Sequence, residues 1–139
     1  FTMQLQVVTP MGAKVDTVVA QVTVPGELGD MGILPGHRAL LSGLGIGALS
    51  YTADGATSYL AINGGYVEVD SSRVIVVTET AETPDEIDVE RAKASLSRIQ
   101  GEAASLDADA TAEQARIAAA IRRAENRIEV AKLSKPSIA

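Results

Sequence analysis

Few side chains in this sequence are of the types that carry out chemistry. The 139 residues include no cysteine, which excludes a thiol nucleophile and a cysteine-ligated metal, and they include a single histidine, His37. A lone histidine without a second histidine or a nearby carboxylate pair is more often a packing or interface residue than a general base or a metal ligand. No hydroxyl residue stands in a nucleophile-elbow pattern. We therefore expect no catalytic constellation, no metal site and no required cofactor.

Two motifs resemble ligand-binding loops without completing them. Residues 26–36 are rich in glycine, but they lack the Gly-Lys-Ser/Thr ending of a phosphate-binding loop and no helix pattern follows them. Asp107 and Asp109 have the spacing that opens a calcium loop, yet Ala112 and Ala118 occupy the places of its turn glycine and its bidentate glutamate. The sequence predicts an ordered surface loop for the first motif and a solvated polar turn for the second.

Three arginines in the last quarter of the chain form the one basic cluster with a regular spacing. Arg116, Arg123 and Arg127 are seven and four residues apart, so in a helix they lie along one edge. Residues 116–135 hold six Lys and Arg against two Asp and Glu, although the whole chain has a net charge of −6. This edge is either a solvated basic face or a binding surface for an acidic protein or for an anionic small ligand such as a nucleotide.

The composition of the whole chain excludes several other partners. The acidic net charge opposes binding to phosphate backbones, and aromatic residues, at 3%, are too few to stack on bases, so nucleic acid is not an expected partner. No apolar stretch reaches the roughly 18 residues of a membrane span, and the first residues do not have the pattern of a signal peptide. We expect a soluble chain, and the absence of cysteine is consistent with a reducing compartment.

The elements that must position these residues change type near Pro84. Eleven of the 12 glycines, 12 of the 14 valines and all four aromatic residues precede it, whereas alanine dominates from residue 92 onward. Valine favours strands and alanine favours helices, so strands are followed by helices rather than alternating with them. The sequence predicts an all-β unit over residues 1–84 and a separate helical unit over 85–139, which is α+β by content.

Six runs of strand-forming residues alternate with turn signals in the β unit, and this spacing predicts a sandwich or flattened barrel. Asp54-Gly55 is typical of a type I′ hairpin turn, because both residues tolerate a positive φ. Asn63-Gly64-Gly65 and Asp70-Ser71-Ser72 are interpreted as breaks between strands. The expected strands are residues 3–8, 18–24, 46–53, 57–62, 66–69 and 73–78.

The helical unit contains two apolar stripes with the 3.6-residue period of a helix, and they predict an antiparallel hairpin. The stripes cover residues 89–106 and 117–131. Thr111 and, three residues later, Gln114 fit a capping box that would start the second helix. Much of each stripe is alanine, which buries little apolar area, so we expect the hairpin to hold the sandwich weakly and to be able to open.

Three motifs, in order along the chain, resemble the epsilon subunit of rotary F-type ATP synthases. The first is Gly-Ile-Leu-Pro-Gly-His at residues 32–37, followed by Ala-Leu-Leu at 39–41 and Gly-Ala-Leu at 47–49. The second, residues 63–69, is similar to that family's Gly-Gly-Phe-x-Glu-Val element with tyrosine in place of phenylalanine. The third, Ile-Asp-Val-Glu-Arg-Ala at 87–92, resembles the motif that opens the helical hairpin. The resemblance implies a flattened β-sandwich of about ten strands followed by a C-terminal α-helical antiparallel hairpin.

The resemblance also implies a noncatalytic part of the rotor. In that family the sandwich lies at the foot of the gamma subunit and against the c-ring, and it couples proton-driven rotation of the ring to the shaft that drives ATP synthesis in the alpha and beta subunits. The loop after residue 26 is the expected contact with gamma and the c-ring. Its expected contact residues are Glu27, Leu28, Gly32, Ile33, His37 and Arg38.

Two properties of the hairpin follow from the same resemblance. In bacterial relatives the hairpin either lies on the sandwich or extends along gamma, where basic residues of its second helix meet an acidic segment of beta and block ATP hydrolysis. Some relatives bind ATP on the folded hairpin, so ATP is an expected regulatory ligand, although Asp88 would serve as a helix N-cap with or without it. The expected inhibitory residues are Arg116, Arg122, Arg123 and Arg127, and the expected nucleotide-binding residues are Ile87, Asp88, Arg91, Ala92, Arg123 and Arg127.

Two alternative functions remain from the residues alone: a free-standing nucleotide-binding regulatory module, and a structural β-sandwich adaptor unrelated to ATP synthase. Neither explains why the sandwich motifs and the hairpin motifs occur together. The resemblance implies a peripheral protein at the cytoplasmic face of the bacterial inner membrane, with an organellar counterpart as the other expectation.

Overall fold

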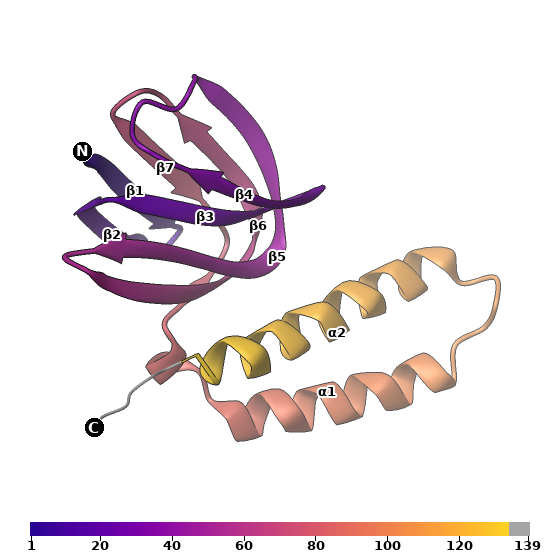
Figure 1. Ribbon diagram of the computed structural model, residues 1–139. Coiled ribbons are helices and arrows are strands. Elements are labelled where there is room, and N and C mark those ends of the chain that lie inside the picture. The colour runs from indigo at the N-terminus through magenta and orange to yellow at the C-terminus, as the bar shows by residue number, and fades with distance from the viewer. Residues whose placement is uncertain (134–139) are drawn as a thin grey trace.

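The computed structural model describes residues 1–133, in which eight strands precede a short 3-10 helix and two α-helices (Figure 1). Every second residue of a typical strand is apolar: Met3, Leu5 and Val7 of the first strand are buried, while Gln4 and Gln6 between them are partly exposed. The strands are β1 (Met3–Thr9), β2 (Gly12–Val19), β3 (Gln21–Gly26), β4 (Gly29–Ile33), β5 (Leu40–Ala53), β6 (Ala56–Val69), β7 (Arg73–Val77) and β8 (Ala81–Glu82).

The strands form a β-sandwich, as the sequence predicted. One sheet with the order β2-β1-β7-β6-β5-β3-β4 makes both layers, and β8 pairs with β6. Of the strand pairs, β1 and β7 run parallel and the others are antiparallel. The 14-residue strands β5 and β6 curve from one layer into the other (Figure 1). Between the layers lies one apolar core, which includes Leu5, Leu49, Leu60, Ile62 and Val76.

The interpretation of Asn63-Gly64-Gly65 as a break between strands is wrong, because β6 runs through it. The pairing with β5 keeps a single register across the glycines, from Leu44 opposite Gly65 to Ile46 opposite Asn63. Gly64 and Gly65 have φ angles of 71° and 106°, which favour glycine. The glycines therefore bend a long strand instead of ending it.

The structure has eight strands within residues 1–133 where about ten were expected. The glycine-rich tract 26–36 is not wholly a loop, because β4 occupies its middle and pairs with β3. The expected strand 18–24 is two strands that meet at Ala20. Asp54 and Gly55 have φ angles of 53° and 79°, so the predicted hairpin turn between β5 and β6 is confirmed.

The helical unit begins with the 3-10 helix η1 (Pro84–Glu86) and continues as α1 (Val89–Ala104) and α2 (Thr111–Ala131). Asp88 caps α1, since its Oδ1 accepts a hydrogen bond of 3.0 Å from the backbone N–H of Arg91. The predicted capping box at Thr111 is wrong: residue 110 holds the cap position and offers no side-chain bond. Gln114 instead donates from Nε2 to the backbone oxygen of Asp107, 3.0 Å away, so the turn itself uses this amide.

The two helices pack against each other as an antiparallel hairpin, and the hairpin touches the sandwich at one end (Figure 1). α2 contacts β5 and β6, while the turn between the helices points away from the sheet. Within residues 1–133 neither helix has the length and apolar content needed to cross a membrane.

Candidate functional site

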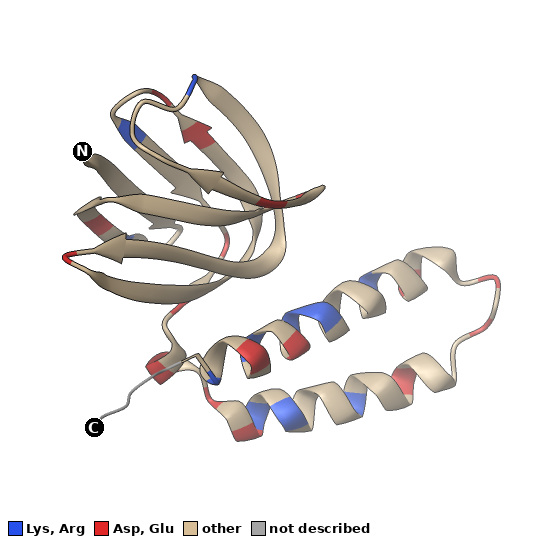
Figure 2. Cartoon of the chain, in the orientation of Figure 1, with Lys and Arg blue, Asp and Glu red and all other residues tan. Residues whose placement is uncertain are grey.

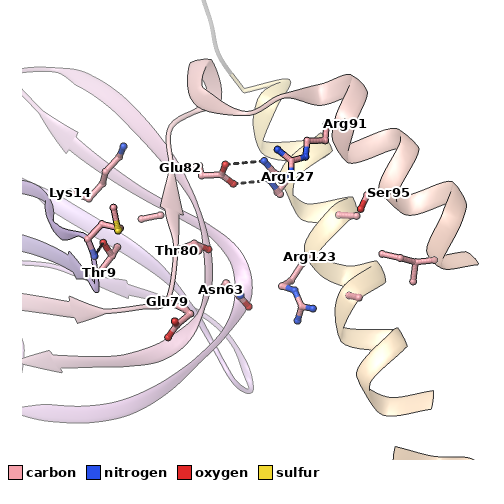
Figure 3. Close-up of a pocket in the computed structure, with 15 residues that line it drawn as sticks. Thr9, Lys14, Asn63, Glu79, Thr80, Glu82, Arg91, Ser95, Arg123 and Arg127 are labelled. Atoms are coloured by element: carbon pink, nitrogen blue, oxygen red, sulfur yellow. Dashed lines mark hydrogen bonds and ion pairs between the residues drawn. The ribbon is translucent and has the colours of Figure 1, made fainter. Parts of the chain in front are cut away.

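A cleft of about 680 Å³ lies between the hairpin and the sandwich (Figure 3). Both helices line one wall, and the other wall comes from the ends of β1 and β2 and from residues 79–82. A cleft of this volume is in the range of sites for small organic ligands. Arg91 of α1 and Arg123 and Arg127 of α2 all line it, so the structure brings together three of the predicted nucleotide-binding residues.

Arg127 is already engaged across the cleft. Its Nε and Nη2 donate to Oε1 and Oε2 of Glu82 in β8 at 2.7 and 2.9 Å, in the two-pronged geometry that a guanidinium and a carboxylate favour (Figure 3). The Arg127 and Glu82 side chains are 30% and 27% exposed, so water only partly screens the pair. Sequence reasoning missed Glu82, because no local pattern connects residues 45 positions apart.

Arg91 and Arg123 leave the cleft with uncompensated positive charge. Among residues 1–133 neither guanidinium forms an ion pair, although Glu79 also lines the cleft. Guanidinium groups held close together bind an anion with several oxygens most strongly. The cleft therefore has the size and charge for an anionic small ligand.

The lysine of the cleft is bound to the segment that leads into the hairpin. Lys14 Nζ lies 2.5 Å from Oε2 of Glu86, and the backbone N–H of Thr83 donates to Oε1 of Glu86 at 2.9 Å. The Lys14 ammonium and this N–H hold the pKa of the Glu86 carboxyl below its usual value. Within the described part of the chain, no group of three or more His, Cys, Asp or Glu could hold a metal ion.

The other predicted nucleotide-binding residues do not line the cleft. Ile87 and Ala92 are buried, at 7% and 0% exposed, and they support the packing of the hairpin. The Asp88 carboxylate caps α1 through the bond to the Arg91 backbone. These three residues shape the start of the helix from which Arg91 reaches the cleft.

The remaining predicted inhibitory residues lie on the exposed side of α2. Arg122 is exposed, and Arg116 is bound to Glu113 one turn earlier, with Nη2 2.6 Å from Oε2. The Glu113 carboxylate raises the pKa of the Arg116 guanidinium. Figure 2 shows basic residues along both helices and acidic residues at the turn that joins them. A docked hairpin thus presents Arg116 and Arg122 to solvent while Arg123 and Arg127 face the sandwich.

The predicted contact residues of the sandwich fall at separate places. Glu27 and Leu28 form the tip of the β3–β4 hairpin, where Leu28 is fully exposed, and His37 and Arg38 lie in the connection from β4 to β5. Gly32 is exposed in β4. The prediction of Ile33 as a contact residue is wrong, because its side chain is 1% exposed and packs in the core.

An exposed patch on β5 and β6 was missed from the sequence. Leu41 and Tyr66 are 69% and 47% exposed, and the pairings of Leu41 with Glu68 and of Gly43 with Tyr66 place these four residues together. The Glu27 carboxylate lies over Gly43, where an added Cβ would come within 2.5 Å of its Oε1. We call Glu27, Leu41, Gly43, Tyr66 and Glu68 the outer patch. The sequence did not reveal it, because the strand pattern predicted neither the exposed face of β5 nor the path of β6.

Comparison with known proteins identifies the fold and its family. The family model described as "ATP synthase, Delta/Epsilon chain, beta-sandwich domain" matches residues 2–84. The chain belongs to the ATP synthase delta/epsilon chain family. The "ATP synthase epsilon chain 2" of Syntrophotalea carbinolica is 44% identical over 129 residues, which cover 93% of each chain. The "ATP synthase epsilon chain" of Trichlorobacter lovleyi is 48% identical over 98 residues, or 70% of this chain and 71% of that relative. The resemblance to epsilon subunits is thereby confirmed.

Two solved structures share the fold of this ATP synthase epsilon-type chain. A chain in the mitochondrial ATP synthase of Euglena gracilis, solved with OSCP, F1 and c-ring, matches with a TM-score of 0.81 and 24% identity. This match covers 96% of the present chain and 82% of the Euglena chain. A chain in the central stalk and c-ring of the Tetrahymena thermophila mitochondrial ATP synthase matches with a TM-score of 0.69 and 13% identity, over 93% and 96% of the two chains.

Proposed function

We propose that the chain is a noncatalytic rotor subunit of ATP synthase that couples rotation of the c-ring to the gamma shaft. Its hairpin acts as a conformational inhibitor of ATP hydrolysis, and ATP is a regulatory ligand of the cleft. The observation that carries this proposal is the combination of an epsilon-type sandwich with a basic hairpin that docks at one end only. The matched structures come from ATP synthase assemblies that include the c-ring, which supports the same partners here.

The rotor role requires a stiff body with exposed contact residues. A single apolar core joins the two layers of the sandwich, and the outer patch and Leu28 are exposed on it. Apolar side chains such as Leu41, ringed by Glu27 and Glu68, fit a protein interface. We assign the outer patch and the Glu27, Leu28, His37 and Arg38 surface to contacts with gamma and the c-ring.

A pull-down with gamma and the c-ring tests the rotor role. Leu41→Asp places a charge in the outer patch at an exposed position, so binding should fall at least tenfold while the sandwich stays folded. Val18→Asp on β2, at another exposed apolar position, is the matched control and should bind as the unchanged chain does. Equal binding by all three chains would remove the outer patch from the interface.

The inhibitory role is supported by the exposed arginines of α2 and by the limited contact between hairpin and sandwich. An extended hairpin would present Arg116, Arg122, Arg123 and Arg127 to an acidic segment of the beta subunit. Removal of the residues after Ile87 should therefore raise ATP hydrolysis by the assembled enzyme. If hydrolysis stays the same, the hairpin is not an inhibitor in this protein.

The regulatory ligand is supported by the charge and size of the cleft. Calorimetry with ATP on the full chain should give a binding heat that disappears in Arg123→Ala and persists in Arg98→Ala, an exposed α1 arginine that does not line the cleft. The absence of heat at millimolar ATP would exclude the ligand.

The partners also set the location that we propose. A subunit held by gamma, the c-ring and the alpha and beta subunits lies at the membrane as a peripheral protein. The bacterial sources of the relatives that match over most of their length favour the cytoplasmic face of a bacterial inner membrane. The mitochondrial sources of the matched structures keep an organellar counterpart as the second candidate.

A further inference from the structure

The apolar contact between the hairpin and the sandwich is small. The main core contains strand residues alone. A separate cluster of three buried residues, Ala61 of β6, Ile87 and Val130 of α2, joins the two units, and Ala48, Tyr59, Val89 and Ala131 pack partly buried against it. Three of these seven residues are alanines, which bury little apolar area, so the cluster is much smaller than the main core. The position of the docked hairpin therefore also depends on its polar contacts.

Two adjacent residues of α2 supply those polar contacts, and they reach different strands. Asn126 donates from Nδ2 to the backbone oxygen of Gly47 in β5 at 2.9 Å. Arg127 makes its two-pronged pair with Glu82 in β8 (Figure 3). Because the acceptors lie on separate strands, the two contacts together fix both the height of α2 over the sheet and its rotation about its own axis.

We propose that Glu82, Arg127, Asn126 and the Gly47 carbonyl form a polar latch that sets the equilibrium between the docked and the undocked hairpin. This inference rests on the proposed inhibitory function for its biological meaning, but the latch itself is a property of the isolated chain. Glu82 acts within the chain as a substitute for an acidic partner, since it occupies the guanidinium that the partner would bind. Release then exchanges one carboxylate for another on Arg127, which keeps the two states close in free energy.

The exposed arginines determine the order in which an acidic partner would meet the basic residues of α2. Arg116 and Arg122 remain on the solvent side of the docked hairpin, so an acidic surface can meet them before the latch opens. Arg127 becomes available after its pair with Glu82 breaks. The docked hairpin thus holds its central basic residue out of reach until the partner is close.

The distance between the hairpin and the sandwich in the full chain tests the latch directly. The sequence has no cysteine, so fluorescent labels can be placed at Ala56→Cys, exposed at the start of β6, and at Ala108→Cys, exposed in the turn between the helices. Single-molecule energy transfer without nucleotide should show a docked population that Glu82→Gln reduces, with a shift of the docking equilibrium on the order of tenfold, or about 1.4 kcal/mol. Glu125→Gln, an exposed carboxylate of α2 without a partner on the described part of the sandwich, should change nothing.

Two further variants keep the test decisive. Asn126→Ala should also favour the undocked state, and the charge swap of Glu82→Arg with Arg127→Glu should restore docking relative to either single change. Circular dichroism identifies any variant whose hairpin opens only because the sandwich unfolds. If Glu82→Gln unfolds, the label distance in Asn126→Ala decides the test. An unchanged distance in both Glu82→Gln and Asn126→Ala, or a hairpin that is already undocked in the unchanged chain, would overturn the latch.

Hydrolysis by the assembled enzyme separates the latch from the inhibitory function. Glu82→Gln leaves every arginine of α2 in place, so an opened hairpin should inhibit ATP hydrolysis more strongly than the unchanged chain does. A variant that opens in the isolated chain without increasing inhibition supports the latch and contradicts the inhibitory function. A variant that stays docked while truncation after Ile87 still raises hydrolysis contradicts the latch and leaves inhibition standing.

Discussion

Gly65 shows how a single residue determines the path of the longest strands. Its φ of 106° lies in the region that L side chains avoid, and a Cβ built on it would stand 1.9 Å from the backbone oxygen of Val77 in β7. The strand cannot move away, because β6 is paired on both sides at this point. The close approach of β7 is thus possible because residue 65 has no side chain.

Gly65→Ala is expected to destabilise the sandwich by about 3 kcal/mol or more, since the backbone clash adds to the strain of the positive φ. Urea denaturation followed by circular dichroism measures this change. Gly32→Ala in β4 is the control, because a Cβ there meets nothing within 4 Å; it should alter the free energy of unfolding by about 0.5 kcal/mol or less. A mild effect at Gly65 would mean that β6 and β7 can separate locally.

The pair of Lys14 and Glu86 makes stability depend on pH in a predictable direction. The pKa of Glu86 is lowered from its ordinary value of 4.5, first by Lys14 and then by the Thr83 N–H, so the ionised carboxylate is favoured by folding. Its contribution is complete above pH 4.5 and is lost as the pH falls through the lower pKa of the folded state.

Glu86→Gln should therefore lower the free energy of unfolding by about 0.5 to 1 kcal/mol at neutral pH, a value typical of a mostly exposed ion pair with an added hydrogen bond. The difference from the unchanged chain should shrink as the pH falls below 4.5 and disappear below the lowered pKa of the folded state, because the carboxyl is then protonated in both states. Lys14→Gln should cost a similar amount and add little to Glu86→Gln. If the difference in the free energy of unfolding were equally large at low pH, the destabilisation by Glu86→Gln would come from packing rather than from charge.

At the scale of elements, α1 is a helix with a weak point. Gly101 lies inside it, is exposed and has open space where a Cβ would be. Gly101→Ala should stabilise the helix by about 1 kcal/mol through helix propensity, and amide hydrogen exchange in α1 should slow about fivefold. The distance between labels on hairpin and sandwich should stay the same, since residue 101 does not contact the sheet. Faster exchange would show that the glycine is required for the pairing of α1 with α2.

The elements also show what sequence patterns can and cannot predict. The helices follow from the 3.6-residue stripes, and the Asp54-Gly55 turn follows from the φ angles it needs, because both are local properties. The continuity of β6 through Gly64 and Gly65 and the presence of β4 in a glycine-rich tract depend on partners supplied by other strands. For the same reason Arg123 and Arg127 could be predicted as one basic edge, whereas Glu82 as the partner of Arg127 could not.

At the scale of the whole molecule, the sandwich and the hairpin differ in how much each depends on the other. The main core is made by β1 to β7 and by Ala81, and it includes no helix residue. Lys14 and Glu86 still join the sandwich to its own exit segment when the helices are absent. The hairpin instead relies on the latch and on the cluster of Ala61, Ile87 and Val130 for its place on the sheet.

A chain that ends at Ile87 should therefore fold by itself into the sandwich. It keeps every strand pair, including β8 with β6, and loses the cover that Val130 gives to Ala61 and Ile87. That loss amounts to about 1 kcal/mol, so the midpoint of thermal unfolding should fall by about 4–8 °C with a transition that stays cooperative. Circular dichroism should show the helical signal gone and the β signal kept. A broad transition, or a midpoint lower by about 20 °C or more, would mean that the hairpin is part of the folding unit and that its release during regulation is far more costly than the latch implies.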